Sequence, residues 1–322
     1  MRIHSNDGIS SKARESLVEE GFKVTTDHIP QDQLNDYLNE QGVEVLLVRS
    51  ATKVRRDLID ACPKVRLIGR GGVGLDNIDV VYAKSKGITV VNTPASSSIS
   101  VAELVMAHLF SLSRSLHKCN RRMPAEGRTQ FKALKKEYEK GMELRGKTLG
   151  VVGFGRIGQW TARYALGCGM NVVYTDNHAT AEAIEVPIGS VMVRVPVRMV
   201  SMEELLKTSD AISIHVPSQK DGRPVIGASE LKHVKPGVVI VNTARGGSVD
   251  EEALLAAIKD GRVRGAALDV FVNEPEPNAS LLVEPNLSLT PHIGAATAEA
   301  QGRIGDELAD RIIAWRSAAA VS

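Results

Sequence analysis

The sequence is poor in cysteine and in aromatic residues, and each shortage excludes a class of protein. Its three cysteines, Cys62, Cys119 and Cys168, are too few and too scattered along 322 residues for a disulfide framework or a structural zinc site. Only 5 Phe, 5 Tyr and 2 Trp are present, which disfavours a module that stacks nucleic-acid bases on aromatic rings. We therefore expect neither a metal site nor a base-stacking surface.

The chain also has little excess charge and no long apolar run. Lys and Arg together number 40 and Asp and Glu 38, so the formal net charge is +2, which argues against a broad surface for nucleic acid or anionic membrane. No run approaches the roughly 18 apolar residues of a membrane span, and the first residues lead into no signal-peptide core. We expect a reduced, cytoplasmic protein with no nucleic-acid or membrane partner.

What the sequence does contain is a regular alternation of short apolar segments with amphipathic ones. Strands are expected at 44–48, 65–68, 88–92, 148–152, 172–175, 211–216, 238–242, 266–269 and 287–290. Helices are expected at 33–40, 79–86, 156–166, 202–208, 229–234, 250–259 and 297–315. Strands that alternate with helices predict an α/β fold with doubly wound parallel sheets, and a length of 322 residues suits two domains of about 150 residues each.

The boundary between the two domains is expected near residue 98. Ser100 and Glu103 have the spacing of a helix capping box, which predicts a mostly apolar bridging helix from there to about residue 118. The last helix is expected to return to the first domain. The first domain would then comprise 1–98 and 291–322, with 99–290 inserted in it. The alternating segment 183–200 is expected to form an extra hairpin.

A glycine-rich segment in the second domain has the spacing of a dinucleotide-binding turn. Gly153, Gly155 and Gly158 follow a predicted strand and precede a helix, whose first N–H groups can bind a pyrophosphate. Asp176 ends the next strand, where a carboxylate holds ribose hydroxyls and repels a 2′-phosphate. The segment therefore predicts a Rossmann-like domain that binds NAD in preference to NADP.

The same glycine spacing occurs in the first domain, but its context differs. Gly69, Gly71 and Gly74 follow a predicted strand, yet the next strand ends without an acidic residue. Arg70 lies inside this segment and favours a turn that contacts an anion. A purely structural glycine turn is the alternative.

Ionisable side chains follow three strands of the second predicted sheet. Arg245 lies on a glycine-rich turn, Glu274 lies in a loop after the next strand, and His292 follows the last. Ligands bind beyond the carboxyl ends of parallel strands, so we expect these side chains to share one site. Arg245 can bind a carboxylate through two hydrogen bonds, His292 can protonate a carbonyl oxygen as hydride arrives, and Glu274 can hold the imidazolium. Each alone is more often structural, but together they predict hydride transfer at a 2-oxo acid.

Four segments resemble the D-isomer-specific 2-hydroxyacid dehydrogenase family, and the resemblance covers nearly the whole chain. They are the glycine segment 153–158, the arginine segment 242–247, the Glu-Pro segment 269–275 and the histidine segment 291–297. Two further segments, 48–54 and 69–79, are similar to the substrate-phosphate side of the phosphoglycerate dehydrogenases within that family.

The resemblance implies oxidation of 3-phospho-D-glycerate to 3-phosphohydroxypyruvate with NAD, at the entry to serine synthesis. It also implies a homodimer or homotetramer, and a short form without a C-terminal regulatory domain. Besides the glycines and Asp176, the residues that it assigns to NAD are Arg156, Ile157, Pro217, Ala244 and Asp269. The residues that it assigns to the substrate are Arg49, Lys53, Arg70, Gly72, Val73 and Arg245.

Charge supports the phosphate assignment, but two alternatives stay open. The substrate carries about three negative charges, and Arg245 can neutralise only its carboxylate end. A glyoxylate or hydroxypyruvate reductase would need the Arg245, Glu274 and His292 set without the cations at 49 and 53. An NAD(H)-sensing protein like the corepressors of the same fold would leave those cations unexplained.

Overall fold

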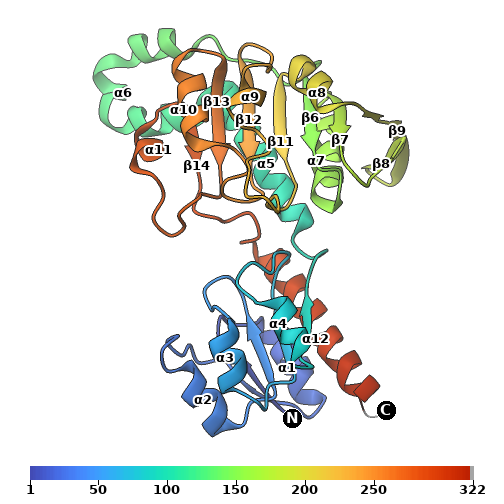
Figure 1. Ribbon diagram of the computed structural model, residues 1–322. Coiled ribbons are helices and arrows are strands. Elements are labelled where there is room, and N and C mark those ends of the chain that lie inside the picture. The colour runs from blue at the N-terminus through green and yellow to red at the C-terminus, as the bar shows by residue number, and fades with distance from the viewer. Residues whose placement is uncertain (320–322) are drawn as a thin grey trace. The chain divides into compact units, whose positions relative to one another are not determined.

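The chain folds into two compact units. The computed structural model describes residues 1–319 (Figure 1). Unit 1 comprises Met1–Ser98 and the described chain from Ala295 onward, and unit 2 comprises Ile99–Gly294. The second boundary lies after Gly294 rather than after residue 290 as expected, because Asp269 accepts hydrogen bonds from the N–H groups of Ile293 and Gly294 and so retains them in unit 2.

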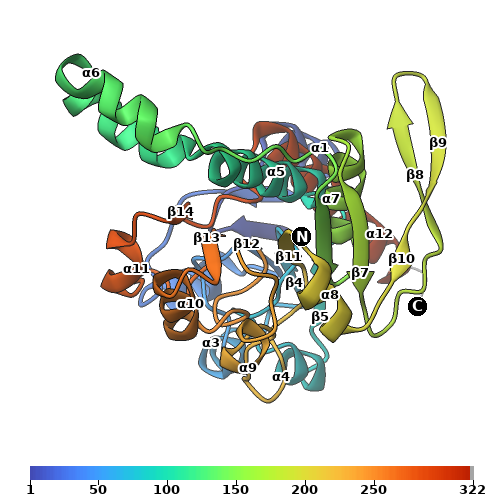
Figure 2. The same cartoon turned by 90° about the horizontal axis from the view of Figure 1, so that it is seen from above.

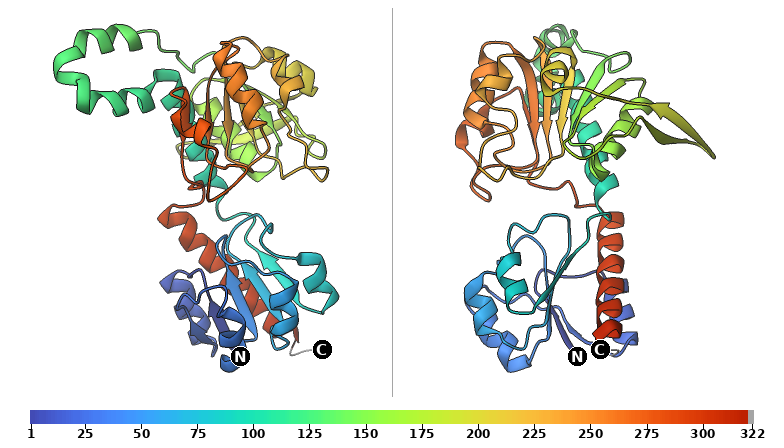
Figure 3. Two further views of the ribbon diagram at one scale, coloured as in Figure 1. Left: turned by 60° about the vertical axis from the view of Figure 1, so that its left-hand side comes forward. Right: turned by 45° about the vertical axis from the view of Figure 1, so that its right-hand side comes forward.

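Within the described residues, unit 1 is built on a five-stranded parallel sheet in the order β2-β1-β3-β4-β5. Helices α1 and α12 lie on one face of the sheet and α2 on the other (Figure 3). Leu17 of α1 and Ile312 of α12 are buried in the core on the first face, and Leu38 of α2 is buried in the core on the second. The strands are β1 (Arg2–Ser5), β2 (Lys23–Thr25), β3 (Val45–Val48), β4 (Leu67–Arg70) and β5 (Thr89–Asn92), and the helices are α1 (Ser11–Glu19), α2 (Leu34–Gln41), α3 (Arg56–Ala61), α4 (Val80–Ser85) and α12 (Ala298–Ala319).

The first strand of unit 1 was not expected from the sequence, because two of its three buried residues, His4 and Ser5, are polar. His4 is fully buried in β1, and its ring nitrogens bond to Thr25 Oγ1 at 2.9 Å and Asn6 Oδ1 at 3.1 Å. These partners satisfy the imidazole inside the unit, so a segment without an apolar run can still form a central strand.

The glycines of the first-domain segment serve packing. Gly69 lies within β4, where an added Cβ would come 2.6 Å from Leu47 and 3.3 Å from Leu308 of α12. A Cβ on Gly71 would come 3.1 Å from Ile304 of the same helix. No helix follows this turn until α4 begins at Val80. The segment therefore lacks the helix N-terminus that a pyrophosphate requires.

Unit 2 is built on a seven-stranded parallel sheet in the order β10-β7-β6-β11-β12-β13-β14. Leu109 of α5 and Ala162 of α7 belong to the core on one face, while Leu205 of α8 and Leu254 of α10 belong to the core on the other. The strands are β6 (Thr148–Val152), β7 (Asn171–Thr175), β10 (Arg198–Met199), β11 (Ala211–Ile214), β12 (Val238–Asn242), β13 (Val263–Leu268) and β14 (Leu287–Leu289), and the helices are α5 (Ser98–Arg114), α6 (Leu116–Tyr138), α7 (Arg156–Gly167), α8 (Met202–Thr208), α9 (Ala228–Leu231), α10 (Glu251–Lys259) and α11 (Ala279–Val283). Both units therefore have the predicted α/β fold.

The bridging helix differs from the expected one at both ends. α5 begins at Ser98, so Ser100 lies inside the helix and its hydroxyl donates to the carbonyl of Gly294 at 2.7 Å instead of capping. The helix ends before Ser115, which has a left-handed φ of 54°, and α6 then continues to Tyr138. Within residues 1–319 no single helix is long and apolar enough to span a membrane, and only α5 and α6 taken together as a bent pair meet those criteria.

The expected hairpin is present in the segment 183–200. β8 (Ala183–Ile188) and β9 (Val191–Pro196) pair antiparallel and project from the β7 side of unit 2 (Figure 2). One face of the hairpin carries three aliphatic pairs, and only its base is buried in the core. The pairs are Ile184 with Val195, Val186 with Val193, and Ile188 with Val191.

A half-buried histidine, His215, follows β11. The Nε2 atom of His215 lies 2.9 Å from the hydroxyl of Ser213, whereas its Nδ1 has no hydrogen-bond partner among the described residues. Burial lowers the pKa of His215 to about 3. The unfolded chain takes up this proton near pH 6.5, so the folded state loses stability as the pH falls below that value.

We predict that replacing His215 removes part of the acid sensitivity of unit 2. Between pH 7 and pH 5 the native protein should lose about 2 kcal/mol of unfolding free energy through this residue alone, and His215→Leu should lack that loss. Urea unfolding in a Trp315→Phe background, where Trp160 of α7 reports on unit 2, measures the difference. Equal pH dependence in both proteins would contradict the assignment.

Candidate functional site

The sheet of unit 2 has a topological switch at its centre. From β6 the chain proceeds to β7 on one side, and it later returns through β11 to the other side. The loops that leave these two strands diverge, so a crevice opens at their carboxyl ends. The glycine segment that begins at Gly153 follows β6, and the segment His215–Pro217 follows β11.

The glycines of this segment leave room for a pyrophosphate at the start of α7. Gly153 has a φ of +92°, and a Cβ there would come 2.8 Å from the carbonyl oxygen of His215. A Cβ on Gly158 would collide with the carbonyl oxygen of Gly153, so the glycine lets the helix approach the strand. A Cβ on Gly155 would meet nothing within 4 Å. Gly155 is also the N-cap of α7 and gives no side-chain bond to its first N–H groups, which fits a bound phosphate.

Asp176 lies directly after β7 and ties the glycine segment to that strand. One carboxylate oxygen accepts the N–H of Phe154 at 2.6 Å, and the other accepts those of His178 at 2.7 Å and Ala179 at 2.8 Å. Burial raises the pKa of Asp176, but the three N–H groups outweigh it and the pKa is lowered. The side chain is therefore ionised at neutral pH, as a group that holds ribose hydroxyls must be.

The other residues assigned to NAD lie along the same edge of the sheet. Arg156 and Ile157 form the first turn of α7, Pro217 follows β11, and Ala244 follows β12. Asp269 follows β13, is 1% exposed, and accepts hydrogen bonds from the chain itself. Its donors are the Thr290 hydroxyl at 2.6 Å and the N–H groups of Ile293 at 2.8 Å and Gly294 at 2.9 Å.

His292 and Glu274 form a hydrogen-bonded pair at this edge. The His292 Nδ1 lies 2.7 Å from Glu274 Oε2, and the other oxygen of Glu274 accepts the N–H of Phe271 at 2.9 Å. The two side chains remain 47% and 36% exposed, so both can be reached from solvent. His292 has a left-handed φ of 54°, a conformation that residues other than glycine adopt infrequently. The pair leaves Nε2 as the atom for proton transfer.

Arg245 lies on a turn that Asn242, the last residue of β12, holds in place. The Asn242 side chain accepts the N–H of Ala244 at 3.0 Å and donates to the carbonyl of Arg245 at 2.9 Å. A Cβ on Gly246 would collide with the carbonyl of Phe271. The arginine turn thus packs directly on the loop that leads to Glu274.

Unit 1 presents a group of cations at the carboxyl edge of its own sheet. Arg49 follows β3 and Arg70 ends β4, and the pairing of Val48 with Arg70 places the two strand ends side by side. Lys53 is exposed in the loop after Arg49. Two further predicted residues follow β4, but the N–H of Gly72 donates to Thr93 Oγ1 at 2.8 Å and the carbonyl of Val73 accepts Asn92 Nδ2 at 2.7 Å.

Two residues that the sequence reasoning missed hold the loop of Arg49 and Lys53. Asp7 accepts the N–H of Arg49 and the hydroxyl of Thr52, each at 2.6 Å. The Asn77 side chain donates to the carbonyls of Arg49 at 2.7 Å and Thr52 at 2.6 Å. The position of Asp7 directly beyond β1 was the available signal, but it required knowledge of that strand.

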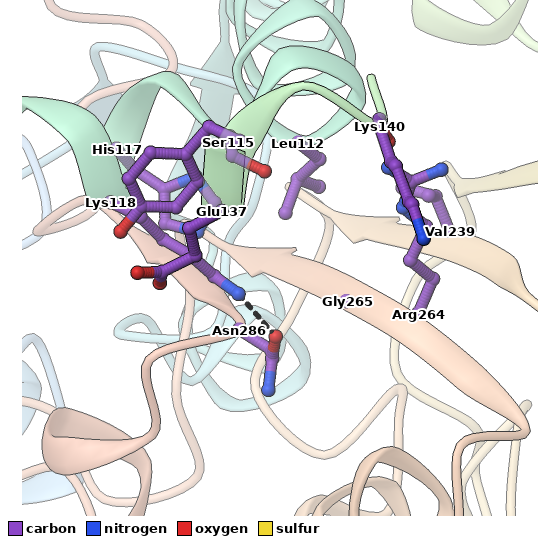
Figure 4. A pocket seen from close by; sticks show the side chains of 11 residues that line it. Leu112, Ser115, His117, Lys118, Glu137, Lys140, Val239, Arg264, Gly265 and Asn286 are labelled. Atoms are coloured by element: carbon purple, nitrogen blue, oxygen red, sulfur yellow. Dashed lines mark hydrogen bonds between the residues drawn. The ribbon is translucent and has the colours of Figure 1, made fainter. Parts of the chain in front are cut away.

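A separate cavity of about 210 Å³ lies at the opposite, amino-terminal edge of the unit 2 sheet (Figure 4). Two of the cations that line it are bonded within the chain. Lys118 donates to Asn286 at 2.6 Å, and Arg264 donates to the carbonyl of Lys140 at 2.9 Å. The cavity is remote from the glycine segment and from His292, which follow the carboxyl ends of strands.

Comparisons with known proteins agree with this geometry. Residues 106–294 match the family model described as the NAD binding domain of D-isomer specific 2-hydroxyacid dehydrogenases. The chain is 44% identical over 315 residues to the hydroxypyruvate reductase of Thermotoga maritima, which covers 97% of each chain. Among solved structures, the TT0316 protein of Thermus thermophilus matches with a TM-score of 0.83 at 30% identity, over 99% of this chain and 97% of that one. The predicted NAD-binding domain is thereby confirmed.

Another relative is considerably longer than this chain. The D-3-phosphoglycerate dehydrogenase of Methanocaldococcus jannaschii is 40% identical over 312 residues. The match covers 97% of this chain but only 57% of that enzyme.

We predict that Asp176→Ala shifts cofactor preference toward NADPH. The change removes the negative charge and leaves the N–H groups of Phe154, His178 and Ala179 able to bind a 2′-phosphate. The ratio of the NADPH and NADH dissociation constants should move toward NADPH by about tenfold or more, measured by fluorescence titration.

Asp210→Ala is the matched control for this change. Asp210 also accepts a backbone N–H of a neighbouring strand, that of Thr148 at 2.9 Å, but at the amino-terminal edge of the same sheet. The ratio should not change in this control. An unchanged ratio in Asp176→Ala would refute the role of the carboxylate.

Proposed function

Because the chain belongs to the D-isomer specific 2-hydroxyacid dehydrogenase family, we propose that it interconverts 3-phospho-D-glycerate and 3-phosphohydroxypyruvate with NAD, the first step of serine synthesis. The observation that carries the proposal is the group of cations at the carboxyl edge of unit 1. Arg49, Lys53 and Arg70 exceed what a small unphosphorylated 2-oxo acid needs. Asp7 and Asn77 hold the loop of the first two, as a site for a fixed anion requires.

The two ends of this substrate have different partners in the proposal. Its carboxylate binds Arg245 of unit 2, whose planar guanidinium matches a carboxylate through two parallel hydrogen bonds. Its phosphate binds Arg49, Lys53 and Arg70 of unit 1. The assignment balances about three negative charges on the substrate with four cations.

The reaction needs a proton donor and acceptor at the oxygen bonded to C2, the carbon that gains or loses hydride. Bound NAD supplies the hydride acceptor, and NADH the donor. In the reductive direction, the Nε2 of protonated His292 gives its proton to the carbonyl oxygen as C2 receives hydride, and in the oxidative direction it removes the hydroxyl proton. Glu274 stabilises the positive charge on the ring through Nδ1 at 2.7 Å. Arg245 fixes the carboxylate so that the carbonyl faces His292.

A second candidate is the reduction of hydroxypyruvate. It is favoured by the Thermotoga maritima relative, which matches this chain over 97% of both lengths, whereas the phosphoglycerate dehydrogenase relative is much longer. This reaction uses Arg245, Glu274 and His292 in the same roles and gives the cations of unit 1 no role in substrate binding.

We also propose that the enzyme works in the cytoplasm as a homodimer. Two adjacent helices of unit 2, α5 and α6, carry large apolar side chains that are exposed in the single chain. They are Phe110, Leu116, Met123 and Phe131.

The substrate is decided by comparing oxidation of NADH with 3-phosphohydroxypyruvate, hydroxypyruvate and glyoxylate. We predict the highest kcat/KM for the phosphorylated acid. Arg49→Ala should lower kcat/KM for that acid by about 100-fold, because a charge-assisted phosphate contact is lost, and lower it for hydroxypyruvate by less than about threefold.

Lys64→Ala is the matched control for Arg49→Ala. Lys64 is an exposed cation of the same unit that precedes β4 and so lies at the other edge of the sheet. Lys64→Ala should leave kcat/KM unchanged for 3-phosphohydroxypyruvate, hydroxypyruvate and glyoxylate. Higher kcat/KM for either unphosphorylated acid in the native protein would replace the first proposal with the second.

We predict that Glu274→Gln lowers kcat about 100-fold, because a neutral amide stabilises the imidazolium of His292 far less than a carboxylate does. The dissociation constant for NADH should stay the same. Steady-state kinetics and fluorescence titration measure the two quantities. Glu276→Gln, an exposed neighbour in the same loop, should keep native kcat. Native kcat in Glu274→Gln would exclude the proposed pair.

A further inference from the structure

A buried histidine on α5 connects that helix to the loop that carries His292. His108 is 4% exposed and lies among the buried apolar residues of α5, such as Val105 and Leu109. Its Nδ1 lies 3.0 Å from the hydroxyl of Ser288 in β14, and its Nε2 lies 3.1 Å from the hydroxyl of Thr290. Every polar atom of the ring therefore has a partner on the chain segment leading to His292.

The direction of each hydrogen bond in this network follows from its last member, the carboxylate of Asp269. The Thr290 hydroxyl has one hydrogen, and it donates that hydrogen to Asp269 Oδ1 at 2.6 Å. Because an ionised carboxylate only accepts, Thr290 must accept from His108. His108 is then neutral with its proton on Nε2, and its Nδ1 accepts from Ser288.

The same carboxylate holds the backbone on both sides of His292. Asp269 accepts hydrogen bonds from the Thr290 hydroxyl, which precedes His292, and from the N–H groups of Ile293 and Gly294, which follow His292. His292 lies between these anchors with its left-handed φ of 54°. A change in the Thr290 hydroxyl would therefore act directly on the segment that fixes the His292 ring.

We infer that His108 is a positioning residue for His292, and that it acts as the neutral Nε2–H form through Thr290 and Asp269. This inference rests on the proposed catalytic role of His292. An apolar side chain would suit the surroundings of α5 at lower desolvation cost, so the imidazole is retained for its two directed hydrogen bonds. Burial lowers the pKa of His108, opposed by the charge of Asp269 and assisted by that of His117, which keeps the ring neutral.

The first test reads the ring directly and requires no activity. Nitrogen NMR of protein with isotope-labelled histidine distinguishes the two neutral forms and the charged form, and the His108 signals are assigned by their loss in His108→Gln. The Nε2–H pattern should persist from about pH 6 to 8. An Nδ1–H pattern, or a charged ring in that range, would overturn the inference.

The second test separates positioning from filling of space. His108→Phe retains the volume without hydrogen bonds, whereas His108→Gln offers both a donor and an acceptor. With hydroxypyruvate and 3-phosphohydroxypyruvate as substrates, His108→Phe should lower kcat about tenfold or more, since a small misplacement of a catalytic group is enough. The pH profile of kcat/KM should also differ from that of the native protein, because the hydrogen-bonded pair of His292 and Glu274 loosens.

The dissociation constant for NADH should change less than about threefold in His108→Phe, and His108→Gln should regain kcat to within about threefold of native. His117→Gln is the matched control, because His117 bonds to the Pro285 carbonyl at 3.2 Å outside this network, and it should behave as native protein. Equal losses of kcat in His108→Phe and His108→Gln would overturn the inference. So would a native kcat together with a native pH profile in His108→Phe. If His108→Phe does not fold, His108→Gln and the NMR pattern decide. If the native protein reduces neither acid, the proposed function fails and the NMR result still stands on its own.

Discussion

All strands of the unit 2 sheet run in one direction, and this constraint decides where the chemistry lies. The carboxyl ends of all these strands lie at the same edge of the sheet, so residues that are far apart in the sequence lie close together there. Gly153, Asp176, Arg245, Glu274 and His292 each come within a few residues of a strand end or in the loop that follows it. The sheet thus brings the glycine turn, Arg245, and the pair of Glu274 and His292 to one edge from separate βα connections. Unit 1 repeats the arrangement for its own cations.

The carboxylate of Asp269 is the point at which fold and site depend on each other. A buried negative charge is costly unless donors surround it, and this one has three. Those donors come from the residues on either side of His292. The same bonds therefore stabilise the charge, fix an unfavourable backbone conformation and set the last residue of unit 2 at Gly294. Strain at His292 is maintained because the surrounding contacts determine its position.

Much of unit 2 could be predicted because its central strands are continuous apolar runs. All five residues of Val238–Asn242 are buried, and such a segment reads as a parallel strand with helices on both faces. β1 could not be predicted in this way, because the buried ring of His4 has a hydrogen-bond partner, Thr25, on another strand. The pair of Glu274 and His292 was foreseeable, since both follow neighbouring strands.

The role of His108 was not foreseeable in the same way. Its partners are 180 and 182 residues away in the sequence, and only the packing of α5 beside β14 brings them together. For a similar reason the anchors of the Arg49 loop could not be inferred, because Asp7 and Asn77 meet only after three strands have assembled. Sequence patterns locate strand ends well, but they carry little information about the polar contacts that hold each loop.

The insertion of unit 2 into unit 1 sets an order of events during synthesis. The five strands of unit 1 are complete by Asn92, yet the helix that covers one of their faces, α12, begins at Ala298. At about 5 to 20 residues per second, the ribosome needs on the order of 10 to 40 seconds to make the chain between them. During that interval the apolar face that carries Leu17, Leu47 and Leu67 lacks Ile312, and unit 2 is released whole before unit 1 can close. A nascent chain of this protein therefore exposes, for most of its synthesis, an apolar surface that the finished protein buries.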